Sequence, residues 1–180
     1  EGLDDRVEYI AKDYREISGN CDAFVSVGML EHVGVEHYAE LGQVINRCLS
    51  NRGIGLIHTI GQNLGLPMNS WIERHIFPGA YPPTLSQIVG ILQPHNFSVL
   101  DVENLRLHYA RTLNQWLERY ERQIETTEAE HDSFFARAWR FYLAGSQATF
   151  LTGRLQLFQV VFSRHMNNAI PLTRQHLTTR

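Results

Sequence analysis

The chain has 180 residues, of which 43% are hydrophobic and 19% are charged, and its formal net charge is −3. This size and composition are typical of one soluble globular domain with a substantial core. The charge excludes a general attraction to nucleic acid or to an anionic bilayer, so we expect no nucleic-acid partner and only local membrane contact.

Redox and targeting features favour a cytoplasmic protein without a metal site. The cysteines, Cys21 and Cys48, have neither the spacing of a metal-binding CxxC pair nor that of a disulfide framework. The start of the chain has no signal-peptide pattern, and no apolar stretch is long enough to span a bilayer. Nine histidines are present without an HExxH motif or other close ligand spacing, so we expect no metal ligands.

The first half of the sequence predicts two strands, then one helix, then a third strand. Alternating residues over 7–11 predict a short strand that ends in a polar turn. Residues 22–28 predict a buried strand, residues 36–49 a helix that ends at a turn at 51–53, and residues 53–61 a second buried strand. A strand, helix, strand unit joins parallel neighbours, so these buried strands should end at the same edge of the sheet.

The second half predicts short helices, a long helical region and two further strands. These elements are expected at 71–77 (helix), 84–92 (helix), 97–102 (strand), 110–152 (helical, in two or three pieces) and 155–163 (strand). Thr84 or Ser86 can cap the helix that ends near Leu92. The last two strands predict an antiparallel edge in a mixed sheet, and the residues from His165 onward are polar and expected to fray.

A carboxylate follows the first buried strand. The apolar run that includes Val25 to Leu30 ends in Glu31, and ligands of open α/β sheets bind at the carboxyl ends of strands. Glu31 is therefore a candidate functional residue, although a carboxylate can equally open the next helix from a solvated turn. His58 should lie beside Glu31, but a histidine on a buried strand is more often a core residue.

Several motifs, in a fixed order over nearly the whole chain, resemble the cyclopropane-fatty-acyl-phospholipid synthases and the related mycolic acid methyltransferases. They lie at residues 13–15, 24–34, 56–61, 71–79, 112–116, 141–145 and 157–162. The resemblance implies an α/β fold: a partial S-adenosylmethionine-dependent methyltransferase with a Rossmann-like mixed sheet, helical insertions and an antiparallel C-terminal edge. It implies that residues 1–165 are the C-terminal portion of a methyltransferase domain and residues 166–180 a polar tail.

The resemblance also implies the chemistry. Family members transfer a methylene or methyl group from S-adenosylmethionine to the cis double bond of a phospholipid acyl chain, and a bound bicarbonate takes the released proton. By motif match, the catalytic residues are Glu31, His58 and Tyr109, and these bind bicarbonate together with the backbone of Ile60. Glu31 and bicarbonate need a shared proton, which the O–H of bicarbonate can supply.

The implied cofactor-binding residues are Tyr14, Gly28 and Met29. Tyr14 resembles the position whose aromatic ring lies against the adenine. Gly28 and Met29 resemble the segment that passes close to the cofactor, where the missing β-carbon of Gly28 leaves room for a ligand.

The helical region is rich in aromatic residues at helical spacings. Such residues are most often core, although an acyl chain also requires an apolar channel. They are Trp116, Tyr120, Phe134, Phe135, Trp139, Phe141 and Phe150.

The sequence departs from the family pattern in two ways. It has no glycine-rich cofactor loop before Val7, and it has Ser146 where many members have a cysteine. Two hypotheses follow. The first is a cyclopropane-synthase-type enzyme, peripheral at the inner membrane face. The second is a non-catalytic remnant or partner subunit that keeps the acyl pocket, lacks cofactor binding, and pairs with a complementing N-terminal polypeptide. A homo-oligomer is a separate expectation, and a third explanation of the missing loop is that the chain is a fragment of a longer protein.

Overall fold

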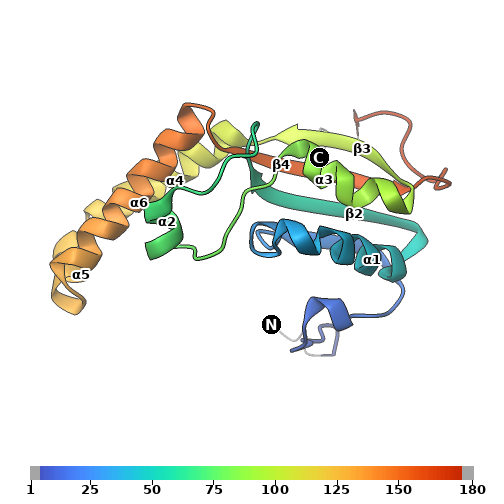
Figure 1. Cartoon of the computed structure of the whole chain (residues 1–180), viewed down its shortest axis with the longest axis horizontal. Coiled ribbons are helices and arrows are strands. Elements are labelled where there is room, and N and C mark those ends of the chain that lie inside the picture. Colours follow the sequence, from blue (N-terminus) through green and yellow to red (C-terminus); the bar gives the residue numbers. More distant parts are fainter. Residues whose placement is uncertain (1–4, 176–180) are drawn as a thin grey trace.

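The computed structural model describes residues 5–175 and consists of a four-stranded sheet with a helical arm at one end (Figure 1). The strands are β1 (Cys21–Val27), β2 (Leu49–Gly61), β3 (Phe97–Asn104) and β4 (Gln156–Arg164). Their order in the sheet is β1-β2-β4-β3. β1 and β2 are parallel, whereas β4 is antiparallel to both β2 and β3. The predicted mixed α/β sheet with an antiparallel C-terminal edge is therefore confirmed.

The described part of the chain also contains six α-helices and four short 3-10 helices. The α-helices are α1 (Tyr38–Cys48), α2 (Ser70–His75), α3 (Leu85–Leu92), α4 (Arg106–Glu121), α5 (Ile124–Glu130) and α6 (Ser133–Leu151). The 3-10 helices are η1 (Tyr14–Glu16), η2 (Leu30–His32), η3 (Val35–His37) and η4 (Gln93–His95). The predicted long helical region is thus three helices, α4 to α6. They form the arm, and α2 lies against it (Figure 1).

One face of the sheet is covered by α1 and α3 (Figure 1). The buried residues of α1 recur at helical spacing and meet Ile57 of β2 in the core between helices and sheet. α3 begins at a capping box in which Thr84 and Gln87 each bond the other's backbone, as expected for Thr84. This local chemistry fixes where α3 starts and holds its apolar side on the sheet.

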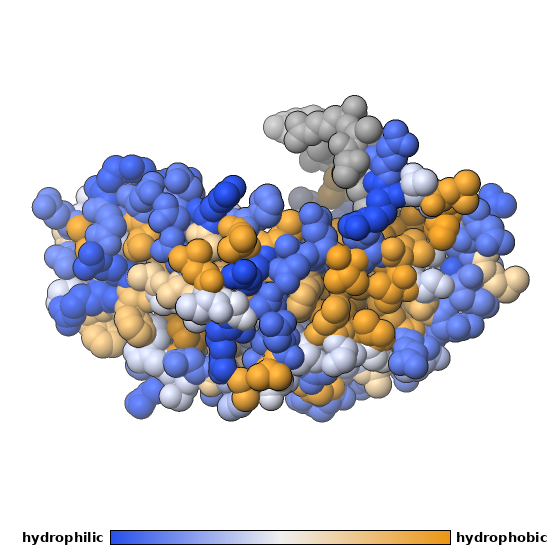
Figure 2. Space-filling model, turned by 90° about the horizontal axis from the view of Figure 1, so that it is seen from above, coloured by the Kyte–Doolittle hydropathy of each residue, from blue (hydrophilic) through white to orange (hydrophobic). Residues whose placement is uncertain are grey.

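The opposite face of the sheet is open near β1. Val25 and Val27 pair in register with Leu56 and His58 on this face, and they are 63% and 64% exposed. Seen from above, hydrophobic side chains gather over the sheet half of the molecule, whereas hydrophilic ones predominate over the outer arm (Figure 2). Parallel strands are normally covered on both faces, so this exposure is unusual for a parallel strand pair.

Two predicted local structures are wrong. Residues 7–11 form no strand, because none of the described strands pairs with them, and Tyr9 is 94% exposed. A segment with an alternating pattern forms a strand only where it can pair with the edge strand of a sheet. The turn at 51–53 is absent, because β2 begins at Leu49 directly after α1 and runs through it.

The aromatic residues of the arm are mostly not core. Phe150 is 1% exposed, but Phe134 and Phe141 are 59% and 60% exposed, and Phe135, Trp116 and Trp139 are also exposed. The arm is only two helices thick and α2 covers only part of it, so Phe141 stays largely exposed although its ring contacts Trp71 of α2 with 4.8 Å between the centroids. Helical spacing therefore predicts that these residues share one face of a helix, but it does not predict whether another element buries that face.

The tail is partly held in place. Asn167 is buried and donates to the backbone oxygen of Arg52, and Arg174 pairs with Asp101 of β3. The expectation that the chain frays from His165 onward is therefore wrong for these residues. Residues 1–4, where the sequence predicts no signal peptide, and residues 176–180 of the predicted tail lie outside the described part. Within residues 5–175, no helix combines the length and hydrophobicity needed to cross a membrane.

Candidate active site

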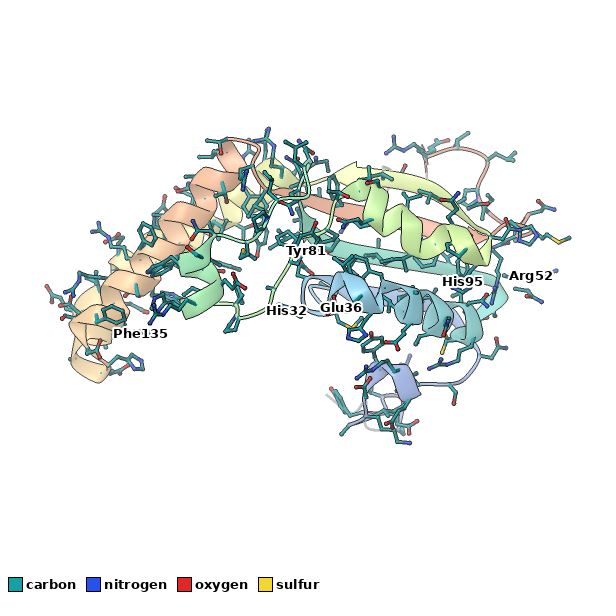
Figure 3. The ribbon with its side chains drawn as sticks, in the orientation of Figure 1. His32, Glu36, Arg52, Tyr81, His95 and Phe135 are labelled. Carbon is teal, nitrogen blue, oxygen red and sulfur yellow. The ribbon has the colours of Figure 1, made fainter. Side chains whose placement is uncertain are left out.

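A cavity of about 640 Å³ lies where β1 and β2 end, and both the sheet side and the helical arm line it. Figure 3 shows His32 and Tyr81 in this central region, between the sheet and the arm. The lining is largely apolar, with contributions from β2, α2, α4 and α6. Its polar members include Glu31, Gln62, Tyr109 and Tyr142.

The end of β1 brings Glu31 to this cavity. Gly28 has φ +63°, a left-handed conformation that L side chains adopt at a cost, and its backbone N–H donates to His58 O at 3.0 Å. The chain then forms η2, which buries Leu30 in the core and leaves Glu31 7% exposed. The backbone oxygen of Glu31 accepts a bond from Tyr81 N at 2.8 Å, so the residue is fixed from two directions.

The Glu31 carboxylate has one bonded and one unbonded oxygen. Oε1 accepts a hydrogen bond from the backbone N–H of Ile60 at 2.6 Å. This donor is free because β1 ends at Val27, opposite His58, while β2 continues to Gly61. Oε2 is buried without a hydrogen-bond partner among the described residues. Because an unpaired buried carboxylate oxygen is costly, Oε2 is a candidate ligand-binding atom.

Two tyrosines add hydroxyl groups to the cavity. Tyr109, on α4, packs its ring against Phe150 of α6, with 4.9 Å between the ring centroids. Burial raises the pKa of Tyr109, and the nearby negative charge of Glu31 raises this pKa further. Burial also raises the pKa of Tyr142 on α6. Both hydroxyls therefore stay protonated well beyond neutral pH and can donate hydrogen bonds.

Sequence reasoning missed Gln62, which organises the loops around the cavity. Its buried side-chain amide donates to the backbone oxygens of Leu66 and Pro82, at 2.9 and 2.8 Å. The preceding Gly61 lets the two chains approach, because a β-carbon there would lie 2.7 Å from Pro83 O. The sequence feature that could have predicted its role is the position of Gln62, a polar residue directly after the last glycine of a buried strand.

Residues 1–160 match the family model described as mycolic acid cyclopropane synthetase. The chain belongs to this family. It is 37% identical over 175 residues to the cyclopropane-fatty-acyl-phospholipid synthase of Escherichia coli (strain K12), covering 97% of this chain and 45% of that protein. It is 33% identical over 165 residues to the tuberculostearic acid methyltransferase UfaA1 of Mycobacterium tuberculosis, covering 88% and 39%. The chain thus spans less than half the length of these curated relatives.

Solved structures of mycolic acid cyclopropane synthases share the fold. The cyclopropane synthase MmaA2 from Mycobacterium tuberculosis matches with a TM-score of 0.79 at 24% identity, covering 89% of this chain and 63% of that chain. The synthase CmaA1, complexed with SAH and CTAB, matches with a TM-score of 0.78 at 25% identity, covering 86% and 59%. The predicted family resemblance and the partial methyltransferase fold are confirmed.

The structure brings together some of the residues expected from the family pattern. Gly28, Glu31, Ile60 and Tyr109 all line the cavity. The Ile60 N–H, expected to contact bicarbonate, is taken by Glu31 itself.

Three expected site residues do not line the cavity. His58 Nδ1 pairs with the side-chain amide of Gln159 at 3.0 Å. Tyr14 and Met29 pack partly buried against the core under α1 and α3. No group of three His, Cys, Asp or Glu side chains within residues 5–175 is placed to hold a metal ion.

Proposed function

We propose that this chain is the acyl-binding and anion-binding portion of an S-adenosylmethionine-dependent enzyme that transfers a methylene or methyl group to a phospholipid cis double bond. In this proposal residues 1–165 are the C-terminal portion of the methyltransferase domain, and the protein works in the cytoplasm, peripherally at the inner membrane face. The observation that carries the proposal is the unpartnered Glu31 Oε2 beside a largely apolar cavity in a member of this family.

The cavity suits an acyl chain. Its volume of about 640 Å³ is within the usual range for small-molecule sites, and apolar side chains such as Ile60, Leu66 and Phe141 line it. Apolar walls around an alkene exclude water, which would otherwise trap a cationic reaction centre. The carboxylate of Glu31 would stabilise positive charge that develops in the cavity.

The donor set fits bicarbonate. Its O–H can donate to Glu31 Oε2, and the Tyr109 hydroxyl can donate to one of its other oxygens. Bound bicarbonate would supply a base for the proton released as the ring closes. His58 remains a predicted member of this set, although its ring bonds Gln159 in this structure.

The cofactor contacts are proposed at Gly28, Tyr14 and Met29. Gly28 supports this best, because it lines the cavity and a β-carbon built on it would have no atom within 4 Å. The methyl group would come from the S-adenosylmethionine sulfonium. The chain would contribute an open backbone turn for the cofactor to approach and a fixed carboxylate three residues later.

The test is cofactor binding followed by methyl transfer. We expect calorimetry of the isolated chain to detect S-adenosylmethionine, with Gly28→Val abolishing the signal and Gly90→Val on α3 leaving it intact. Methyl transfer from labelled cofactor to dioleoyl phospholipid vesicles then measures activity. Absence of binding at millimolar cofactor would rule out the chain as a complete enzyme by itself.

A second candidate function is a subunit that completes its site with another polypeptide. The observation that favours it is the exposure of Val25 and Val27 on β1, an edge strand of the described sheet. A covering polypeptide would bury these side chains. Co-expression with the N-terminal portion of the E. coli relative tests this: recovered methyl transfer, abolished by Val25→Asp, supports it, whereas no stable complex contradicts it.

A further inference from the structure

The cavity has one strongly basic side chain. Among the residues that line it, Arg154 is the single lysine or arginine, while the acidic member is Glu31. Glu31 is buried and Arg154 is exposed, so the negative charge lies in the interior of the site and the positive charge on its solvent side. The two charges therefore give the cavity a polarity along which an amphiphilic ligand can be oriented.

The backbone that carries Arg154 is firmly held. It lies in the connection between α6 and β4, directly after Gly153, which has φ +78° and ends the helix. Leu155 N donates to Thr149 O at 3.1 Å, and Gln156 Nε2 donates to Gly153 O at 2.7 Å. These bonds on both sides of Arg154 fix the direction in which its side chain leaves the backbone.

The guanidinium of Arg154 has no partner in the described part of the chain, neither a hydrogen bond nor an ion pair. Nearby arginines differ: Arg106 donates to the backbone oxygen of Leu151 at 3.0 Å, and Arg140 pairs with Glu121. Arg154 is thus a cation on a fixed turn at the cavity wall, with its five donors available.

We propose that Arg154 binds the phosphodiester of the phospholipid whose acyl chain occupies the cavity, and so selects intact phospholipid as the substrate. The inference rests on the proposed function, since it assumes an acyl chain inside. A guanidinium matches phosphate oxygens with two parallel hydrogen bonds. A phosphodiester, unlike bicarbonate, has no O–H to donate to the Glu31 carboxylate, so the buried carboxylate repels it from the interior. The headgroup therefore stays at Arg154 and the acyl chain points inward.

A fatty-acid carboxylate shares the anionic chemistry of a phosphodiester, so the test compares three ligands with the same acyl chain. Dioleoylphosphatidylglycerol, dioleoylglycerol and oleate are each diluted into the same neutral detergent micelles, and their dissociation constants for this chain are measured by tryptophan fluorescence. The variants are Arg154→Gln and Arg154→Lys. The matched control is Arg137→Gln, which removes an exposed cation of α6 that does not line the cavity.

We expect Arg154→Gln to weaken phosphatidylglycerol binding about tenfold, as for loss of a charged hydrogen bond, and to leave dioleoylglycerol binding unchanged. Arg154→Lys should show an intermediate loss, and Arg137→Gln no change for any ligand. The assignment is overturned if Arg154→Gln affects both glycerolipids equally, affects neither, or weakens oleate alone. If the wild-type chain binds none of the three ligands, the proposed acyl site itself fails, which is a separable result.

Discussion

Glu31 Oε1 and the backbone nitrogen of Ile60 lie 2.6 Å apart, and this bond joins the turn after β1 to the end of β2. It fixes one carboxylate oxygen on a strand edge and leaves Oε2 buried without a partner. An unsatisfied polar atom destabilises a fold unless something else binds it. The geometry therefore predicts that the Glu31 carboxylate lowers the free energy of unfolding when no ligand binds Oε2.

Substitutions of Glu31 should separate its structural bond from its charge. Glu31→Gln keeps an oxygen for the Ile60 N–H and removes the buried charge, so we expect stability equal to or above wild type. Glu31→Ala removes the acceptor and should be about 1–3 kcal/mol less stable than Glu31→Gln. Urea unfolding measures both, with Glu36→Gln at an exposed position as control. Equal losses in both variants would contradict this.

The same glutamine variant should fail in catalysis. In a form of the protein that shows measurable methyl transfer, we expect Glu31→Gln to lower turnover by about 10²–10³-fold. The substitution removes the negative charge that stabilises the positive charge developing on the substrate. Calorimetry should find its cofactor affinity close to that of wild type. Turnover within twofold of wild type would remove Glu31 from the mechanism.

Two glycines should respond oppositely to alanine. Gly28 has φ +63° and open space around a built β-carbon, so Gly28→Ala should cost about 1–2 kcal/mol through backbone conformation alone. Gly90 also has open space but lies within α3, so Gly90→Ala should stabilise by about 0.5–1 kcal/mol. Thermal unfolding gives both values, and changes of the same sign would show that this backbone account is incorrect.

Alkaline pH should weaken the fold through its buried tyrosines. Burial raises the pKa of Tyr38, Tyr109 and Tyr142 above 10.0. The folded state then holds these protons more tightly than the unfolded state. Their contribution to stability is complete below pH 10 and is lost as pH rises through the folded pKa values. Near-ultraviolet phenolate absorbance should show a late-titrating group that shrinks in Tyr109→Phe. Coincident titration of folded and unfolded chain would contradict the prediction.

Aromatic residues of the arm should fall into two stability classes. Phe150 is 1% exposed, and Phe150→Ala should cost about 3–5 kcal/mol by leaving a cavity between α4, α6 and β4. Phe134 is 59% exposed, and Phe134→Ala should change stability by less than about 0.5 kcal/mol. Denaturant midpoints distinguish the two, and a large loss in Phe134→Ala would indicate that this side chain is packed after all.

Much of the fold could be read from local patterns. The spacing of apolar residues predicted β1, α1, β2, α3 and β4, because each element buries one side and the pattern repeats with the period of its backbone. The strand predicted at 7–11 failed because its formation depends on a neighbouring edge rather than on its own residues. The prediction that the aromatic residues of α4 and α6 are core failed for a similar reason, because their exposure depends on which other elements cover them.

The sequence by itself determined the order of helices and strands, the family, and the position of Glu31 at the end of a buried strand. These features follow from short-range patterns and from motifs that occur in a fixed order. The tertiary structure decided that Glu31 bonds Ile60 N, that the His58 ring bonds Gln159, and that Arg154 reaches the same cavity. Each depends on segments far apart in the chain, where strand length, register and packing select the partners that no local pattern specifies.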